Sequence, residues 1–97
     1  MKYIVVEVTT KDIIREFPFI FPEAIVHSQM FQYMQHQMTM HHNADSARCV
    51  AAGFLSSIGV GTAGQCHGES ESLGIKSRGE EDDKLIMMMD YTHGIRL

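Results

Sequence analysis

Residues 3–21 read YIVVEVTTKDIIREFPFIF, and their pattern is the clearest indication of secondary structure in the chain. Apolar side chains recur at about every second position on both sides of a short polar segment, which is the period of a β-strand. Lys11 and Asp12, in that segment, supply the chemistry of a turn. The stretch therefore predicts a β-hairpin with strands at residues 3–10 and 13–21.

The two predicted strands differ in how their side chains are distributed. The first places Ile4, Val6 and Val8 on one face and Tyr3, Val5 and Glu7 on the other. The second places Ile13, Phe17, Phe19 and Phe21 on one face, with Arg15 as a polar interruption. Pro18 lies within this second strand and has no N–H to donate to a neighbour. We therefore expect the second strand to lie at a sheet edge or to contain a bulge.

A long helix is predicted over residues 23–42, because Pro22 suits a first helical turn and no Gly or Pro interrupts the segment. His41 and His42 suit the negative end of the helix dipole, and Asn43 can adopt the left-handed closing conformation. The apolar side chains are Ala24, Val26, Met30, Phe31, Tyr33, Met34, Met38 and Met40. They span about 200° of the helix surface, more than one core contact requires, so we expect a second contact to cover part of them.

The second half of the chain predicts two more strands. Residues 48–58 contain a run of small apolar side chains, which is typical of a buried central strand. Gly53 in this run leaves room for another segment to approach. Residues 65–73 alternate well enough to predict a fourth strand.

The last segment predicts a second helix. Ser77 and Glu80 have the spacing of a capping box, acidic residues follow in the first turn, and His93 and Gly94 suit the end of a helix. The apolar residues at 85–89 are also compatible with a strand, so this alternative stays open.

Together these segments predict a single α+β domain over residues 1–97 with the order ββαββα. Short connections favour antiparallel neighbours, so we expect a four-stranded, mainly antiparallel sheet with both helices on one face. A chain of 97 residues has room for one core and no second domain.

The composition excludes several classes of protein. The formal net charge is -4 and the 8 Lys and Arg are scattered, which argues against binding to nucleic acid. No apolar run approaches the roughly 20 residues of a membrane span, and charge appears too early for a signal peptide. Two cysteines are too few for a disulfide scaffold. We therefore expect a cytoplasmic protein with reduced thiols.

Two arrangements suggest chemistry at first sight. Residues 59–64 match the G-x-G-x-x-G of dinucleotide-binding loops, but no helix begins within them, so we interpret them as a connection between strands. Cys49, Cys66 and His67 lack the spacing of a metal site, and Cys66 and His67 must point to opposite faces of a strand. The sequence therefore predicts no catalytic, cofactor-binding or metal-binding residue. A small enzyme or metal protein that uses Cys66 and His67 is the third hypothesis.

Methionine is the unusual residue, since the chain has 8 Met and no Trp. Flexible, polarizable Met side chains suit adaptable protein contacts. A loosely specified core explains the same pattern, because a helix covered on two sides also has a wide apolar arc. If the surface hypothesis holds, the partner-binding residues are Met30, Tyr33, Met34, Gln37, Met38 and Met40.

Two segments, FIFPEAIVH at residues 19–27 and SRGEED at residues 77–82, resemble small uncharacterised bacteriophage proteins. The resemblance implies either a capsid or tail component that packs against its own copies, or an inhibitor that binds a host defence complex. We therefore expect a non-enzymatic protein-binding or self-assembling module, with a virion structural or decoration role first and an anti-defence inhibitor as the alternative. Its partners would be copies of itself or a host or virion protein, as a homo-oligomer in the host cytoplasm or the virion.

Overall fold

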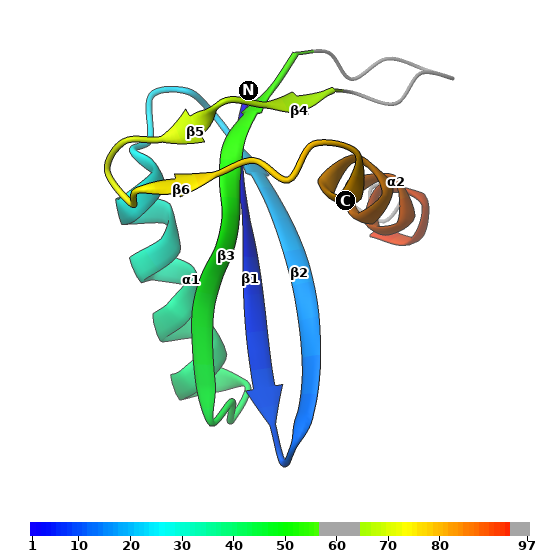
Figure 1. Ribbon diagram of the computed structural model, residues 1–97. Helices are drawn as coiled ribbons and strands as arrows, with labels where there is room; N and C mark the ends of the chain where they lie inside the picture. The colour runs from blue at the N-terminus through cyan, green and yellow to red at the C-terminus, as the bar shows by residue number, and fades with distance from the viewer. Residues whose placement is uncertain (57–64, 94–97) are drawn as a thin grey trace.

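A computed structural model describes residues 1–56 and 65–93 of the chain (Figure 1). Its elements are β1 (Lys2–Thr10), β2 (Ile13–Phe21), α1 (His27–His41), β3 (Ser46–Leu55), β4 (Cys66–His67), β5 (Glu69–Ser70), β6 (Ile75–Lys76) and α2 (Glu80–His93). One sheet has the strand order β2-β1-β3-β4 and is antiparallel throughout, and β5 pairs antiparallel with β6. The predicted α+β class and four-stranded antiparallel sheet are confirmed.

The β1–β2 hairpin forms as predicted. Thr10 pairs with Ile13, and the two residues between them, Lys11 and Asp12, have φ of 49° and 68°. Two consecutive positive φ angles define a type I′ turn, whose twist matches that of the strands. β2 lies at the edge of the sheet, which confirms the prediction made from Pro18.

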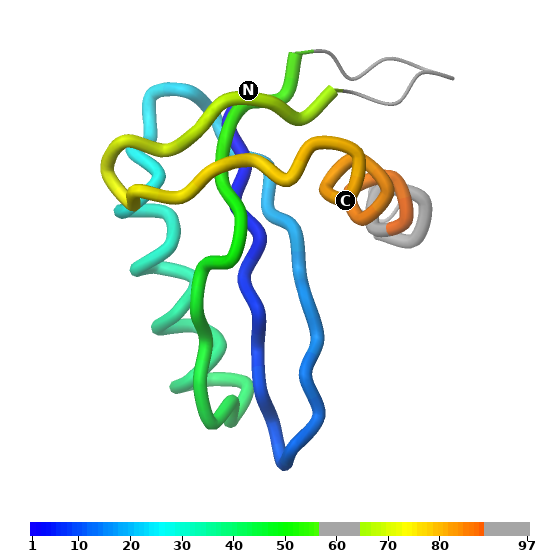
Figure 2. The backbone as a smooth tube through the Cα atoms, in the orientation of Figure 1, coloured from blue at the N-terminus to red at the C-terminus, as the bar shows by residue number. Residues whose placement is uncertain are grey.

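The central strand β1 is covered on both faces. Ile4, Val6 and Val8 belong to an apolar cluster that packs against α1, whereas Tyr3 and Val5 belong to a second cluster that includes residues of α2. The two helices therefore lie on opposite sides of the sheet, as Figures 1 and 2 show. Our expectation that both helices cover one face is wrong, because Tyr3 and Val5 on the other face of β1 are fully buried and need a cover of their own.

α1 begins at His27, later than the predicted start at residue 23. The Ile25 N–H donates to the Pro22 carbonyl at 3.1 Å, so the chain first makes a turn. Val26 then precedes the helix without a side-chain cap. At the other end Asn43 has a φ of 55°, the left-handed closing conformation that the sequence predicts.

β3 is the predicted interior strand, displaced toward the N-terminus to Ser46–Leu55. Its register against β1 shifts between Val5 and Val6, which marks a bulge. Gly53 permits a close approach as expected, since a Cβ atom there would clash with the His67 carbonyl oxygen. The glycine motif at residues 59–64 lies outside the described residues.

The predicted fourth strand over residues 65–73 is mostly wrong. β4 contains two residues, Cys66 and His67, paired with the end of β3. The chain leaves the sheet at Gly68, whose φ of 77° is incompatible with a continuing strand. The short β5–β6 hairpin follows, close to β3 (Figure 1).

Residues 80–93 form the helix α2, which settles the alternative between helix and strand at residues 85–89. The predicted capping box does not form, since Ser77 Oγ accepts from the Gly79 N–H and the Asp82 carboxylate accepts from the Arg78 N–H. Gly94, the predicted end, lies outside the described residues. Within the described part of the chain, neither helix combines the length and the hydropathy that crossing a membrane requires.

Candidate interaction surface

The six residues predicted to bind a partner separate into two groups. Met30, Met34 and Met38 pack against the apolar cluster on the α1 side of the sheet. This placement favours the alternative of a core for these three methionines. Gln37 is half-buried. Tyr33 and Met40 remain 59% and 64% exposed, so they are the two large side chains of the prediction that a partner could reach.

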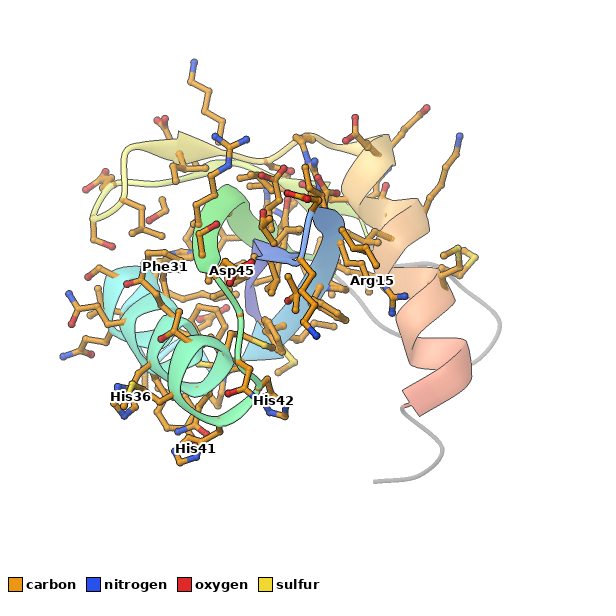
Figure 3. All side chains as sticks on the ribbon, turned by 90° about the horizontal axis from the view of Figure 1, so that it is seen from below. Arg15, Phe31, His36, His41, His42 and Asp45 are labelled. Carbon is orange, nitrogen blue, oxygen red and sulfur yellow. The ribbon has the colours of Figure 1, made fainter. Side chains whose placement is uncertain are left out.

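A groove lies between the end of α1 and the hairpin tip. Its volume is about 460 Å³. Val8, Phe17 and Met38 give it apolar walls, and Arg15 of β2 and His42 at the end of α1, both labelled in Figure 3, also line it. The complete lining is Val8, Thr10, Lys11, Ile13, Arg15, Phe17, Met38 and His42.

The groove exists because α1 does not extend over the whole sheet. The helix contacts β1 and β3, which lie in the interior of the sheet. Phe17 and Arg15 of the edge strand β2 pair with Val6 and Val8 of β1. All four side chains therefore lie on the same face of the sheet. Part of the apolar face near the tip is therefore left without a helix above it.

The tip of the hairpin exposes two large apolar side chains. Ile13 and Ile14 are 56% and 61% exposed, and as consecutive strand residues they point to opposite faces. Asp12 and Lys11 in the turn are also exposed. We call Lys11, Asp12, Ile13, Ile14, Arg15 and the adjoining groove the tip surface.

The charged residues of the tip surface are unpaired within the described part of the chain. Arg48 forms an ion pair with Glu7 at 2.7 Å, and Arg78 forms one with Glu16 at 3.0 Å. Among the residues that the structure describes, Arg15 and Asp12 form no ion pair. Charges of both signs therefore stand beside exposed isoleucines.

Cys66 and His67 lie on opposite faces, as expected from their adjacency in a strand. Cys66 is buried in the cluster beneath α2, and burial together with the hydrogen bond to Asp83 raises the pKa of its thiol to about 12. His67 is exposed and stacks on Phe54 with ring centroids 6.3 Å apart. The two side chains therefore cannot act as a nucleophile and its base.

Cys49 is separate from both residues. It packs on the α1 side of the sheet, and burial raises the pKa of its thiol. Within residues 1–56 and 65–93, no three His, Cys, Asp or Glu side chains are grouped so that they could hold a metal ion.

A buried polar network, which the sequence did not indicate, lies on the α2 side. Asp82 and Tyr3 are both 0% exposed, and the Tyr3 hydroxyl lies 2.5 Å from Asp82 Oδ2 and 2.6 Å from Ser77 Oγ. Because a phenol has one proton, Tyr3 donates to the carboxylate and accepts from Ser77. Burial and this hydrogen bond to Asp82 raise the pKa of Tyr3.

Arg78 completes the network. Its Nε donates to Asp82 Oδ1 at 2.7 Å, and its two terminal nitrogens reach the two Glu16 oxygens at 3.0 Å each. The paired carboxylates in turn raise the pKa of the guanidinium, with Glu16 the larger contributor. The network joins β1, β2 and the start of α2, so its geometry accounts for the docking of α2. The spacing of Arg78 and Asp82, four positions apart, is the one signal in the sequence that could have indicated part of this network.

His27 anchors the start of α1 in a similar way. It is 4% exposed, its Nε2 lies 2.8 Å from the Gly53 carbonyl oxygen, and Phe21 and Phe54 present ring edges to it. The described buried side-chain nitrogen and oxygen atoms all have partners.

Comparison of the chain with protein-family models, with curated proteins and with solved structures finds no match. The resemblance of residues 19–27 and 77–82 to bacteriophage proteins therefore stays a prediction. The tip surface is one feature of the described residues that the packing of the fold does not explain, because Ile13 and Ile14 are exposed beside an apolar groove.

Proposed function

We propose that this protein is a non-enzymatic protein-binding module that associates with other copies of itself through the tip surface. The observation that carries the proposal is the exposure of Ile13 and Ile14, 56% and 61%, beside an apolar groove of about 460 Å³. Exposed apolar side chains grouped at one end of a small domain are typical of contact sites.

The edge strand β2 supports the same end of the molecule as a contact site. An edge strand leaves backbone N–H and C=O groups without partners, and natural proteins protect such edges when they are not used. Pro18 protects the middle of β2, whereas the tip carries isoleucines on both faces. The half of the edge near the tip is thus the less protected half.

The absence of a reactive arrangement at Cys66 supports a role without catalysis. A thiol with a pKa of about 12 is protonated at neutral pH and is a poor nucleophile. His67, on the other face of β4, cannot deprotonate it.

The resemblance to small bacteriophage proteins suggests the setting. A virion structural or decoration component would use the tip surface for repeated contacts between copies. An anti-defence inhibitor would use the same exposed isoleucines to bind one host protein complex and would stay a monomer or small oligomer. A measurement of the oligomeric state would distinguish these two roles.

The experiment is light scattering of the purified protein over a concentration range of about a hundredfold, because self-association follows mass action. We expect the molar mass to rise with concentration, and Ile13→Glu to restore the monomer. Met87→Glu is the matched control, because Met87 is 54% exposed on α2, away from the tip. A monomer at every concentration would contradict self-association and favour the inhibitor.

A further inference from the structure

We infer that two copies of this chain dock about a two-fold axis, so that each hairpin tip covers the groove of the other copy. This inference rests on the proposed function and names its contact. A two-fold interface places the same patch on both sides, so the patch must be complementary to itself.

Two of the three charged residues of the tip surface, Asp12 and Arg15, meet this requirement. Asp12 and Arg15 lie three positions apart on the hairpin, both exposed, and neither forms an ion pair among the described residues. In a two-fold arrangement Asp12 of each copy faces Arg15 of the other, and both pairs form at once. A partner of one sign alone would leave one of these charges without a counterpart.

The apolar side chains also match. Ile13 lines the groove and is 56% exposed, so the groove is open to solvent at the end formed by the hairpin tip of the same copy. A second tip brought to this position adds its isoleucine to the walls formed by Phe17 and Met38. Each copy then supplies both an exposed side chain and the groove that receives one.

Pairing between two β2 edges is the competing arrangement, and Pro18 argues against it. In a two-residue hairpin the flanking pair, Thr10 and Ile13, is hydrogen-bonded, and alternate pairs along the ladder are not. By this alternation Pro18, opposite Val5, belongs to a pair whose backbone groups point away from β1. The free edge of β2 therefore lacks a backbone donor in its middle. Near this position Arg78 forms two hydrogen bonds with Glu16. Contact through side chains at the tip avoids both obstacles.

A contact confined to the tip is small. Stable interfaces bury about 1,200–2,000 Å² in total, and contacts below this range are weak. We therefore expect a dimer with a dissociation constant of roughly micromolar or higher. Light scattering and sedimentation velocity can both follow its dissociation on dilution.

The test is charge reversal in two separate variants, Asp12→Lys and Arg15→Glu. Each variant alone places like charges opposite each other twice, so we expect dimer dissociation to become at least about tenfold easier. In an equimolar mixture of the two variants, every contact again joins opposite charges. We expect the mixture to dimerise within about threefold of the original protein.

Two controls keep the result specific. Lys84→Glu makes a charge change of the same size as Arg15→Glu on the exposed part of α2 and should leave the dimer unchanged. Asp12→Asn removes the charge but keeps a residue that tolerates the positive φ of the turn, and it should weaken the dimer less than Asp12→Lys.

The outcomes are distinguishable. Wild-type dimers that neither charge reversal weakens would overturn the inference and leave self-association standing. Weakening in both variants without recovery in the mixture would overturn the two-fold pairing of Asp12 with Arg15. A strict monomer in the original protein would overturn both the inference and the proposed function.

Discussion

β1 packs against α1 on one face and against α2 on the other, and the two contacts differ in chemistry. Toward α1, the strand presents Ile4, Val6 and Val8 to methionines such as Met34. Toward α2, Tyr3 donates a hydrogen bond to the buried Asp82. One contact is non-directional, while the other depends on specific atoms.

This difference explains why the molecule has a groove on one side. Methionine side chains adapt to irregular gaps, so α1 can pack over the sheet interior without matching every side chain of β2. A buried polar network is stable only when each member is satisfied, which holds the start of α2 in one position against β1 and β2. The apolar contact of α1 therefore tolerates an uncovered part of the sheet near the hairpin tip, whereas the hydrogen bonds at the start of α2 require one fixed position.

The largest expected effect is at the polar contact. Asp82→Ala leaves the Tyr3 hydroxyl and the Arg78 N–H without their acceptor, and breaking a buried charged pair costs about 3–5 kcal/mol. Urea unfolding followed by circular dichroism measures the loss. Glu80→Ala, two residues away on the exposed side of the same turn, should change stability by no more than about 0.5 kcal/mol. A loss below about 1 kcal/mol for Asp82→Ala would mean that the network does not hold α2.

A smaller effect is expected at the apolar contact. Met34→Ala removes a half-buried side chain that packs on the cluster under α1, and we expect a loss of about 2 kcal/mol, the low end for such truncations. Tyr33→Ala, the next residue along, should cost about 0.5 kcal/mol or less because Tyr33 is 59% exposed. Equal losses in the two variants would contradict the separation of core and surface on α1. The same unfolding assay applies.

The smallest effect is an alkaline loss of stability. Cys66 has a pKa of about 12 in the folded protein, above the ordinary value of 9.0, so its stabilising contribution is present at neutral pH. As pH rises past the ordinary value, the unfolded thiol loses its proton first and stability falls. We expect a loss of roughly 1 kcal/mol between about pH 8 and about pH 10. Cys66→Ala should flatten most of this fall, and an unchanged pH profile in that variant would assign it to other groups.

The elements that follow from local periodicity could be predicted from the sequence. Alternation and the turn at Lys11 and Asp12 gave the hairpin, and the uninterrupted segment after Pro22 gave α1. The start of α1 was missed because a turn at Pro22 and a helix at Pro22 look alike in sequence. Gly68 ended β4 early through a positive φ, which alternation does not reveal.

The placement of α2 could not be predicted from local signals. It depends on the contact of Tyr3 with Asp82, which lie 79 positions apart. The local sequence around either residue does not indicate that the two are in contact. The candidate site was missed for a related reason. Ile13 had the period of a core residue, and its exposure depends on α1 ending short of the tip.

The span between Tyr3 and Asp82 also bears on the order of events during synthesis. β1, an interior strand of the sheet, is synthesised before the other described strands, and its Tyr3 face is covered only after α2 has been made. Contacts between distant parts of a chain form slowly, and uncovered apolar strands are prone to associate wrongly in the interval. A nascent chain that has not yet reached α2 therefore exposes Tyr3 and Val5, and it is the form of this protein for which a chaperone would matter most.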